Sequence, residues 1–486
     1  MTFQPAAEHA HALRGGATGG ESALAPADIA WGASLVCFAA ALTATGLLRD
    51  GDTFWHIRAG EWILAHGAVP RTDPFSFTFA GQPWTAHEWL SEVFLALAYR
   101  LAGWSGVLLL TAGAFAGAAL TLVRALGRSL AGPALILLAA AGLGLQVGAI
   151  LARPHSLVLP LIALWAAMLI RARDEDRAPS LAFAPAMTLW ANMHGSFVFG
   201  LALIGCFALE ALLAARPGQR RRVLLGWGGF GLACVGAALV NPVGAEALLF
   251  PFKLMRLQSL SAVIEWRPVP FADTGVFELE LLGLIGLLYL RPLKLPVARA
   301  LLLIGLTHLA LHHARHLPIL GLIAPMSLAR PLAESLGAAP VVTKSRAALI
   351  FAALAVLAAG ARLATPLRNE FGPMAPFAAI AAVPEATRAT PALNSYDFGG
   401  ALIFSGIKPY IDGRTDLYGD AFMARYRRIA AGDPASLDAE LAARGIGWTL
   451  FRPGEKIVAA LDARPGWKRL YSDDVAVIHV RADGPR

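Results

Sequence analysis

Apolar runs long enough to cross a lipid bilayer recur along most of this sequence, and one of the first is "IAWGASLVCFAAALTATGLL", residues 29–48. A bilayer core is spanned by about 20 mostly apolar residues in a helix. Of the 486 residues, 57% are hydrophobic and 15% are charged, whereas an ordinary soluble domain has about 25% charged residues. The sequence therefore predicts an all-α polytopic membrane protein.

We expect about eleven transmembrane helices. Their predicted positions are 28–48, 104–124, 132–151, 155–171, 180–193, 196–215, 223–240, 276–290, 297–312, 317–333 and 346–362. The segments 180–193 and 276–290 are short for a span. An odd number of spans places the two ends of the chain on opposite sides of the membrane.

The distribution of arginine and lysine predicts the orientation, because cytoplasmic loops are enriched in these residues. With the amino terminus inside, the inner loops contain Arg124, Arg128, Arg171, Arg173, Arg177, Arg216, Arg220, Arg221, Arg222, Arg291, Lys294, Arg299, Lys344 and Arg346. The outer loops are sparser, although Arg153 and Arg315 lie in short outer turns. We expect a bacterial inner-membrane protein with a cytoplasmic tail over residues 1–27.

The net charge of +8 does not point to nucleic acid, because the arginines form short clusters between apolar runs and no continuous stripe. The membrane domain is predicted over residues 28–362. Two large segments of the chain are polar: the first outer loop of this domain, 49–103, and the C-terminal segment 363–486. The C-terminal segment predicts a small periplasmic α/β domain.

Within that domain, residues 399–404, 448–451 and 473–480 are predicted strands, and residues 419–432 and 436–445 are predicted helices. The segment "YIDGRTDLYGD", residues 410–420, contains three acids, an arginine and glycines. Contact with sugar or peptide and a hydrogen-bonded loop that holds the domain's shape remain alternatives.

The first outer loop predicts two helices at the membrane surface, residues 53–67 and 84–103. Trp55 and Trp62 suit the headgroup level, where an amphipathic ring keeps one side in water. The alternative is an ordinary amphipathic connector.

The order of a span, an outer acid, a helix ending in Gly-x-x-Pro and a second interfacial helix resembles the GT-C superfamily of membrane glycosyltransferases. The likeness is to the branch with aminoarabinose and protein mannosyl transferases. The matching segments are Asp50 or Asp52 for the acid, "HGAVP" at 66–70, and "HEWLSEVFLALAYRLAG" at 87–103. Family members often have an Asp-Glu pair and a Lys-Pro-Pro-like segment, whereas this chain has Asp50-Gly51-Asp52 and His87-Glu88.

The resemblance implies an enzyme that moves a hexosyl or pentosyl group from a polyprenyl-phosphate-type donor at the outer face of the membrane. The acceptor would be a lipid, glycan or protein of the cell envelope, and membrane lipid surrounds the site. No cofactor is certain, and relatives differ in their need for a divalent cation. A transporter, a lipid flippase or an inactive relative are the competing interpretations.

Asp52 is the first candidate for the general base and Asp50 the second, because transfer requires a carboxylate that deprotonates the acceptor hydroxyl. Asp52 also begins a predicted helix, where a carboxylate can serve as a cap. An acid this close to hydrocarbon favours a functional role.

Further candidates share the outer loops. Residues that could bind the donor phosphate are Arg58, Arg153, His87, Arg315 and His316, with Lys253 and Arg256 also in outer segments. Residues that could orient substrate are His56, Glu88, His155, Asn192, His194, Glu265 and Asp273, and for Glu88, Glu265 and Asp273 binding of a metal is the alternative. The alternatives are snorkelling for Arg153, a surface loop around Glu265, and turn hydrogen bonds for Asn192 and His194. Zinc binding by His308, His312 and His316 is disfavoured, because one helix rarely supplies all ligands.

Overall fold

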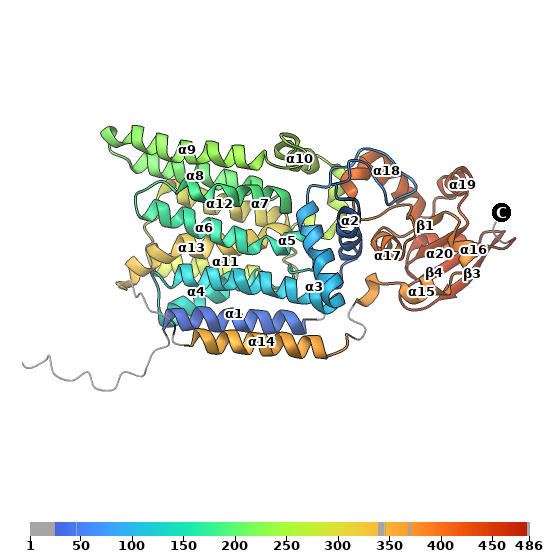
Figure 1. Cartoon of the computed structure of the whole chain (residues 1–486), viewed down its shortest axis with the longest axis horizontal. Coiled ribbons are helices and arrows are strands. Elements are labelled where there is room, and N and C mark those ends of the chain that lie inside the picture. Colours follow the sequence, from blue (N-terminus) through green and yellow to red (C-terminus); the bar gives the residue numbers. More distant parts are fainter. Residues whose placement is uncertain (1–24, 45, 339–344, 346, 368–370, 484–486) are drawn as a thin grey trace, which may run out of the picture.

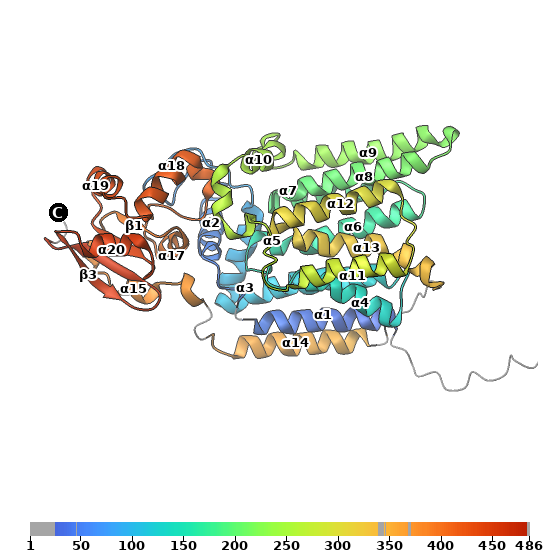
Figure 2. The ribbon, with the colours of Figure 1, turned by 180° about the vertical axis from the view of Figure 1, so that it is seen from behind.

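The computed structural model describes residues 25–44, 46–338, 345, 347–367 and 371–483. A bundle of apolar helices occupies one side of the molecule, and a smaller domain of helices and one sheet lies at one end of this bundle (Figure 1). Figure 2 shows the same arrangement from behind. Most of the predicted N-terminal tail, together with Lys344 and Arg346, lies outside the described residues. We call the end of the bundle that meets the smaller domain the site end.

The bundle is formed by most of the helices between residues 26 and 364. Its α-helices are α1 (Pro26–Thr43), α3 (Trp89–Leu126), α4 (Gly132–Gly144), α5 (Pro154–Leu157), α6 (Leu159–Asp174), α7 (Pro185–Met193), α8 (Phe197–Ala214), α9 (Arg220–Ala238), α10 (Glu246–Met255), α11 (Val276–Leu290), α12 (Val297–His312), α13 (Leu317–Leu336) and α14 (Ala348–Ala364). The short 3-10 helices are η1 (Leu181–Phe183), η2 (Pro217–Gln219), η3 (Gln258–Ala262), η4 (Ile264–Trp266) and η5 (Ala314–His316).

Every predicted span overlaps a helix, but fewer helices than predicted have the length and hydropathy expected of a membrane span. Five stretches do so among the described residues: Pro26–Thr43, Trp89–Leu126, Pro154–Asp174, Phe197–Ala214 and Ala314–Leu336. Some of the others are short because the chain turns early. For example, α4 ends at Gly144, and the following segment turns at Gly148, whose φ is +86°.

The outside of the bundle is strongly apolar. Leu232 on α9, Tyr289 on α11 and Leu349 on α14 are 76%, 91% and 86% exposed. Exposed apolar surface of this extent is unusual for a protein surrounded by water. It fits a bundle whose sides contact hydrocarbon.

The first loop packs against the rest of the protein, and the predicted position of Trp55 at the headgroup level is wrong. Its first helix, α2 (Asp52–His66), is packed between α3 and the helix α17 (Gly399–Phe404) of the C-terminal domain. Trp55, predicted at the headgroup level, is only 6% exposed because it packs against Trp84 and Ile403. The second helix begins at Trp89 and continues past non-helical residues Ala102 and Gly103 into the bundle.

The C-terminal domain contains one four-stranded sheet with helices around it. Its strands are β1 (Ala392–Asn394), β2 (Trp448–Phe451), β3 (Trp467–Ser472) and β4 (Val477–Arg481). They lie in the order β1-β2-β4-β3, with β1 parallel to β2 and the other pairs antiparallel. The helices are α15 (Phe377–Ala382), α16 (Glu385–Arg388), α17, α18 (Thr415–Ala430), α19 (Pro434–Ala443) and α20 (Lys456–Asp462), with η6 (Gly372–Met374) and η7 (Tyr396–Phe398).

The predicted strand at 448–451 and the closing strand within 473–480 are confirmed, as are the helices at 419–432 and 436–445. The predicted strand at 399–404 is wrong, because this segment is α17. It is a short apolar run that is buried almost throughout, and periodicity cannot distinguish a buried strand from a buried helix over so few residues. The strands β1 and β3 were not predicted.

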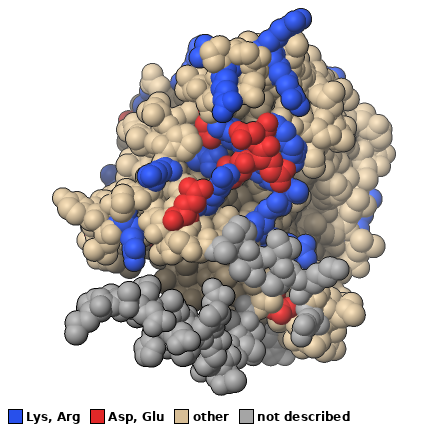
Figure 3. Space-filling view, turned by 90° about the vertical axis from the view of Figure 1, so that its left-hand side faces the viewer, with Lys and Arg blue, Asp and Glu red and all other residues tan. Residues whose placement is uncertain are grey.

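Ion pairs cross the end of the bundle opposite the site end. Arg299 on α12 is 3% exposed and contacts Glu210 on α8 at 3.0 Å and Asp174 at the end of α6 at 2.9 Å. Arg128 and Arg171 both contact Glu175. Figure 3 shows acidic side chains at the centre of this face with arginine and lysine around them.

Candidate active site

Asp50 and Asp52 lie where the chain leaves α1 and enters α2. Gly51, not Asp52, is the residue that precedes the helix, and the Asp52 side chain makes no capping bond. Instead, the Asp52 backbone N–H donates to Asp50 Oδ1 at 2.7 Å. The predicted alternative of Asp52 as a simple cap is therefore wrong. Its carboxylate accepts a hydrogen bond from the Trp55 indole at 3.0 Å, and its other oxygen faces Arg153.

Arg153 contacts three carboxylates from separate parts of the chain. Its guanidinium nitrogens lie 2.9 Å from Asp52, 3.3 Å from Asp50 and 3.2 Å from Glu265. The backbone around it is fixed, because the Ala152 N–H donates to the Leu47 carbonyl at 2.9 Å. These pairs direct Arg153 into the site, so the snorkelling interpretation does not describe this conformation.

Glu265 links Arg153 to a second arginine. Its other oxygen lies 3.6 Å from Arg315, whose guanidinium stacks 4.2 Å from the Trp266 ring centre. The segment around Glu265 is thus part of the site, contrary to its interpretation as a surface loop. Although burial raises the pKa of Glu265, Arg153 and Arg315 lower it to about 2.

A second group of side chains surrounds Glu88, immediately before α3. Its carboxylate lies 3.2 Å from His194 Nε2, 3.7 Å from His87 and 4.0 Å from His56. Burial and the nearby arginines lower the pKa of His194 and of His56. Both imidazoles are therefore neutral at physiological pH and can take part in hydrogen bonds as donor and acceptor.

Burial has the opposite effect on the acids of the site. It raises the pKa of Asp52 to about 7, because desolvation and the nearby Asp50 charge outweigh the attraction of Arg153. It also raises the pKa of Glu88 and of Asp416. A carboxylate that titrates near neutral pH is suited to accept a proton from a hydroxyl.

The C-terminal domain provides one wall of this site. Gly413 lies so close to Asp52 that a Cβ atom at this glycine would overlap the carboxylate. Tyr396 donates to the Gly413 carbonyl at 3.0 Å, and Asp416 is close enough to His87 for its pKa to respond to the imidazole charge. The sequence identified the acidic segment at 410–420 but did not place it beside Asp52.

Several predicted site residues have other contacts. Arg58 binds Glu61 at 2.6 Å and the Phe404 carbonyl at 3.0 Å, so it joins α2 to α17. His155 contacts the Ala149 carbonyl at 2.9 Å. His316 is buried against Phe199, and neither of its ring nitrogens has a hydrogen-bond partner among the described residues.

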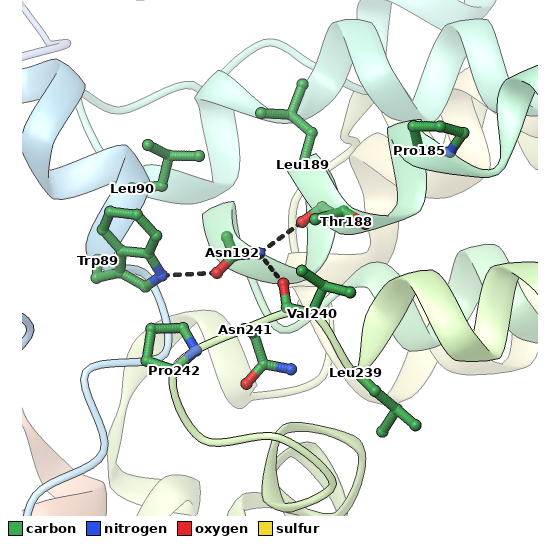
Figure 4. A pocket seen from close by; sticks show the side chains of 10 residues that line it. All are labelled: Trp89, Leu90, Pro185, Thr188, Leu189, Asn192, Leu239, Val240, Asn241 and Pro242. Atoms are coloured by element: carbon green, nitrogen blue, oxygen red, sulfur yellow. Dashed lines mark hydrogen bonds between the residues drawn. The ribbon is translucent and has the colours of Figure 1, made fainter.

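Asn192 has the predicted turn role and also borders a groove. Its amide nitrogen donates to the Thr188 and Val240 carbonyls at 2.7 and 2.8 Å, and its oxygen accepts from the Trp89 indole at 2.8 Å (Figure 4). The groove, of about 720 Å³, is open and mainly apolar, and it lies between α3, α7 and the end of α9. Its lining residues Trp89 and Asn192 are close in sequence to Glu88 and His194. Asp52 and Arg153 do not line the groove.

Within the described part of the chain, no group of three or more His, Cys, Asp or Glu side chains has a geometry that could hold a metal ion. This includes the histidines around α12. The rings of His308 and His312 lie with their centres 4.4 Å apart and are tilted by 51°, and His316 follows in η5.

A comparison with protein-family models found no match, and neither did a comparison with curated proteins.

Proposed function

We propose that this chain is an integral membrane glycosyltransferase that moves a sugar from a polyprenyl-phosphate-type donor to an acceptor hydroxyl. The observation that carries the proposal is the pairing of Asp52 with Arg153 at 2.9 Å, at the boundary between an apolar bundle and a polar domain. A lipid-linked sugar requires such a boundary, because its tail belongs in hydrocarbon and its sugar in water.

In this mechanism, the acceptor oxygen attacks the anomeric carbon while the bond from that carbon to the phosphate oxygen breaks. Asp52 accepts the proton of the acceptor hydroxyl. Arg153 and Arg315 stabilise the negative charge on the departing phosphate, exchanging part of their contact with Glu265 for contact with the phosphate. Glu88 and His194 orient the sugar, and the groove beside Trp89 receives part of the lipid tail.

In the proposed topology, all eleven predicted segments span a bacterial inner membrane, and the bilayer becomes locally thinner around the short ones. The end with Arg128, Arg171 and Arg299 would face the cytoplasm, consistent with its many basic residues (Figure 3). The C-terminal domain and the site would then lie on the periplasmic side.

Transfer from labelled polyprenyl-phosphate and polyprenyl-diphosphate sugars in proteoliposomes tests the function. Asp52→Asn should reduce transfer by at least about 100-fold, the usual contribution of a general base, and Asp50→Asn should reduce it less. Asp176→Asn is the matched control, because this acid is 88% exposed at the opposite end.

Full transfer by both Asp52→Asn and Asp50→Asn would refute the assignment of the base. If the wild-type protein transferred sugar from none of the donors, a transporter, a flippase or an inactive relative would replace the enzyme. Counterflow of the same lipid-linked sugars across the vesicle membrane would then identify a flippase.

A further inference from the structure

One fully buried ion cluster joins the C-terminal domain to the first loop. The side chains of Arg414, Asp412 and Asp73 are completely buried, and Arg414 contacts each carboxylate at 2.7 Å. The guanidinium also lies 4.8 Å from the Trp84 ring centre and 5.3 Å from that of Phe75. Asp412 and Arg414 belong to the C-terminal domain, whereas Asp73, Phe75 and Trp84 belong to the first loop.

The same turn lies directly against Asp52. Gly413, between Asp412 and Arg414, contacts the Asp52 carboxylate so closely that no side chain fits. Two similar close approaches lie nearby, where Gly51 meets the Asp397 carbonyl and Gly400 meets the Gly51 carbonyl. The C-terminal domain therefore approaches the start of α2 backbone to backbone around the candidate base.

We propose that Arg414 is a positioning residue that holds the turn 412–416 against Asp52, so that the C-terminal domain completes the site. Breaking the Arg414 cluster would free the turn, although the bundle and the sheet keep their own cores. The inference rests on the proposed function only for the role of Asp52 as a base. The docking of the turn and its effect on Asp52 are independent of that role.

The turn 412–416 is one of several segments that lie next to Asp52. The charged or titratable groups that face this carboxylate are Asp50 from the first loop, Arg153 from the turn before α5, Glu265 from η4 and Tyr396 from η7. Displacing the turn leaves Asp50, Arg153 and Glu265 in place but admits water. Because desolvation is the largest cause that raises the pKa of Asp52, this pKa should fall when water enters.

Carbodiimide labelling of the full-length protein in lipid nanodiscs measures this effect without any substrate. Carbodiimides react with protonated carboxyls, so the pH dependence of Asp52 labelling, read by peptide mass spectrometry, reports its titration. Arg414→Gln and Gly413→Ala are the test variants, and Gly413→Ala keeps the Arg414 ion pairs. The matched controls are Arg444→Gln, which removes an ion pair with Glu440 in the same domain, and Gly454→Ala, where a Cβ meets no atom within 4 Å.

We expect both test variants to shift the midpoint of Asp52 labelling downward by about one pH unit or more, with no shift in the controls. Arg414→Lys should retain more of the wild-type midpoint than Arg414→Gln. If Arg414→Gln does not fold, Arg414→Lys, which keeps the charge but not the forked contact with both carboxylates, tests the role of Arg414, and Gly413→Ala tests the docking of the turn. A wild-type midpoint in the folded test variants would overturn it, whereas a shifted midpoint together with absent sugar transfer would refute only the proposed function.

Discussion

The Asp52 carboxylate lies 2.9 Å from the Arg153 guanidinium, and the same guanidinium contacts Asp50 and Glu265. The residues come from the start of α2, the turn before α5 and the 3-10 helix η4, and Asp50 and Glu265 lie 103 and 112 residues from Arg153 in sequence. One arginine thus holds three carboxylates at the site end of the bundle. Burial, aided by the nearby charges of Asp50 and Glu265, explains why Asp52 remains able to bind a proton near neutral pH in spite of Arg153.

Arg153→Lys should keep the fold but reduce sugar transfer by about tenfold or more. A lysine carries the same charge, but its single ammonium cannot contact carboxylates in the forked geometry of a guanidinium. Transfer kinetics and the thermal unfolding midpoint measure the two effects. Arg330→Lys is the control, because its exposed pair with Glu334 lies at the opposite end; equal activity of both variants would contradict the role of Arg153.

The rate of transfer should rise with pH through about 7 and then level off. Asp52 must be deprotonated to act as the base, and its pKa is raised to about 7. The pH profile of kcat/KM measures this pKa in the free protein. A profile that is flat from about pH 5.5 to 8.5 would show that no group with the pKa of Asp52 controls the reaction.

Because Asp52 is harder to ionise in the folded protein than in the unfolded chain, its free-energy contribution to folding should become less favourable as pH rises. Its folded pKa exceeds the value of about 3.9 in an unfolded chain, so the folded state binds more protons between these values. Stability from this group is present at low pH and is lost as pH rises toward 7. Asp52→Asn should therefore unfold at a higher temperature than the wild type at about pH 8, and the difference should shrink near pH 5. Thermal unfolding at both pH values checks the sign.

Glu88→Gln should raise the KM for the sugar donor more than it lowers kcat. Glu88 lies among three histidines and separate from the Asp52 and Arg153 pair, which suits binding of the sugar and not proton transfer from the acceptor. Steady-state kinetics separate the two constants. A fall in kcat of about 100-fold with an unchanged KM would instead assign Glu88 to the chemical step.

The helices of this protein were predictable because a long apolar run is a local signal. The predicted segments 276–290 and 297–312 agree with α11 and α12 at both ends. The packing of the first loop was not predictable in this way. Trp55 has the same amphipathic character whether it lies in headgroups or against Trp84 and Ile403, and only the position of the C-terminal domain decides between them.

The charged residues of the candidate site could be predicted from the sequence, but the segment of the C-terminal domain that lies against them could not. Asp52 and Arg153 are conspicuous as charges beside apolar runs, and the structure brings Glu265 to them from a polar segment whose sequence also fits a surface loop. Gly413 carries no such signal, because its importance comes from the absence of a side chain where another segment approaches. A contact of this kind is visible only once both segments have been placed.

Arg299→Met should destabilise the protein by about 3 kcal/mol, because it removes the cation that pairs with Asp174 and one of the two that pair with the buried Glu210, whose other partner is Arg173. Adding Glu210→Gln should recover part of this loss, since removing the buried charge removes most of its desolvation cost, although Arg173 then loses a partner as well. The cluster lies opposite the site, so both variants should retain transfer per folded molecule. Unfolding midpoints in detergent, with Arg330→Met as the exposed control, measure the loss and the recovery. A double variant less stable than Arg299→Met would mean that Glu210 stabilises the bundle through Arg173 more than through Arg299.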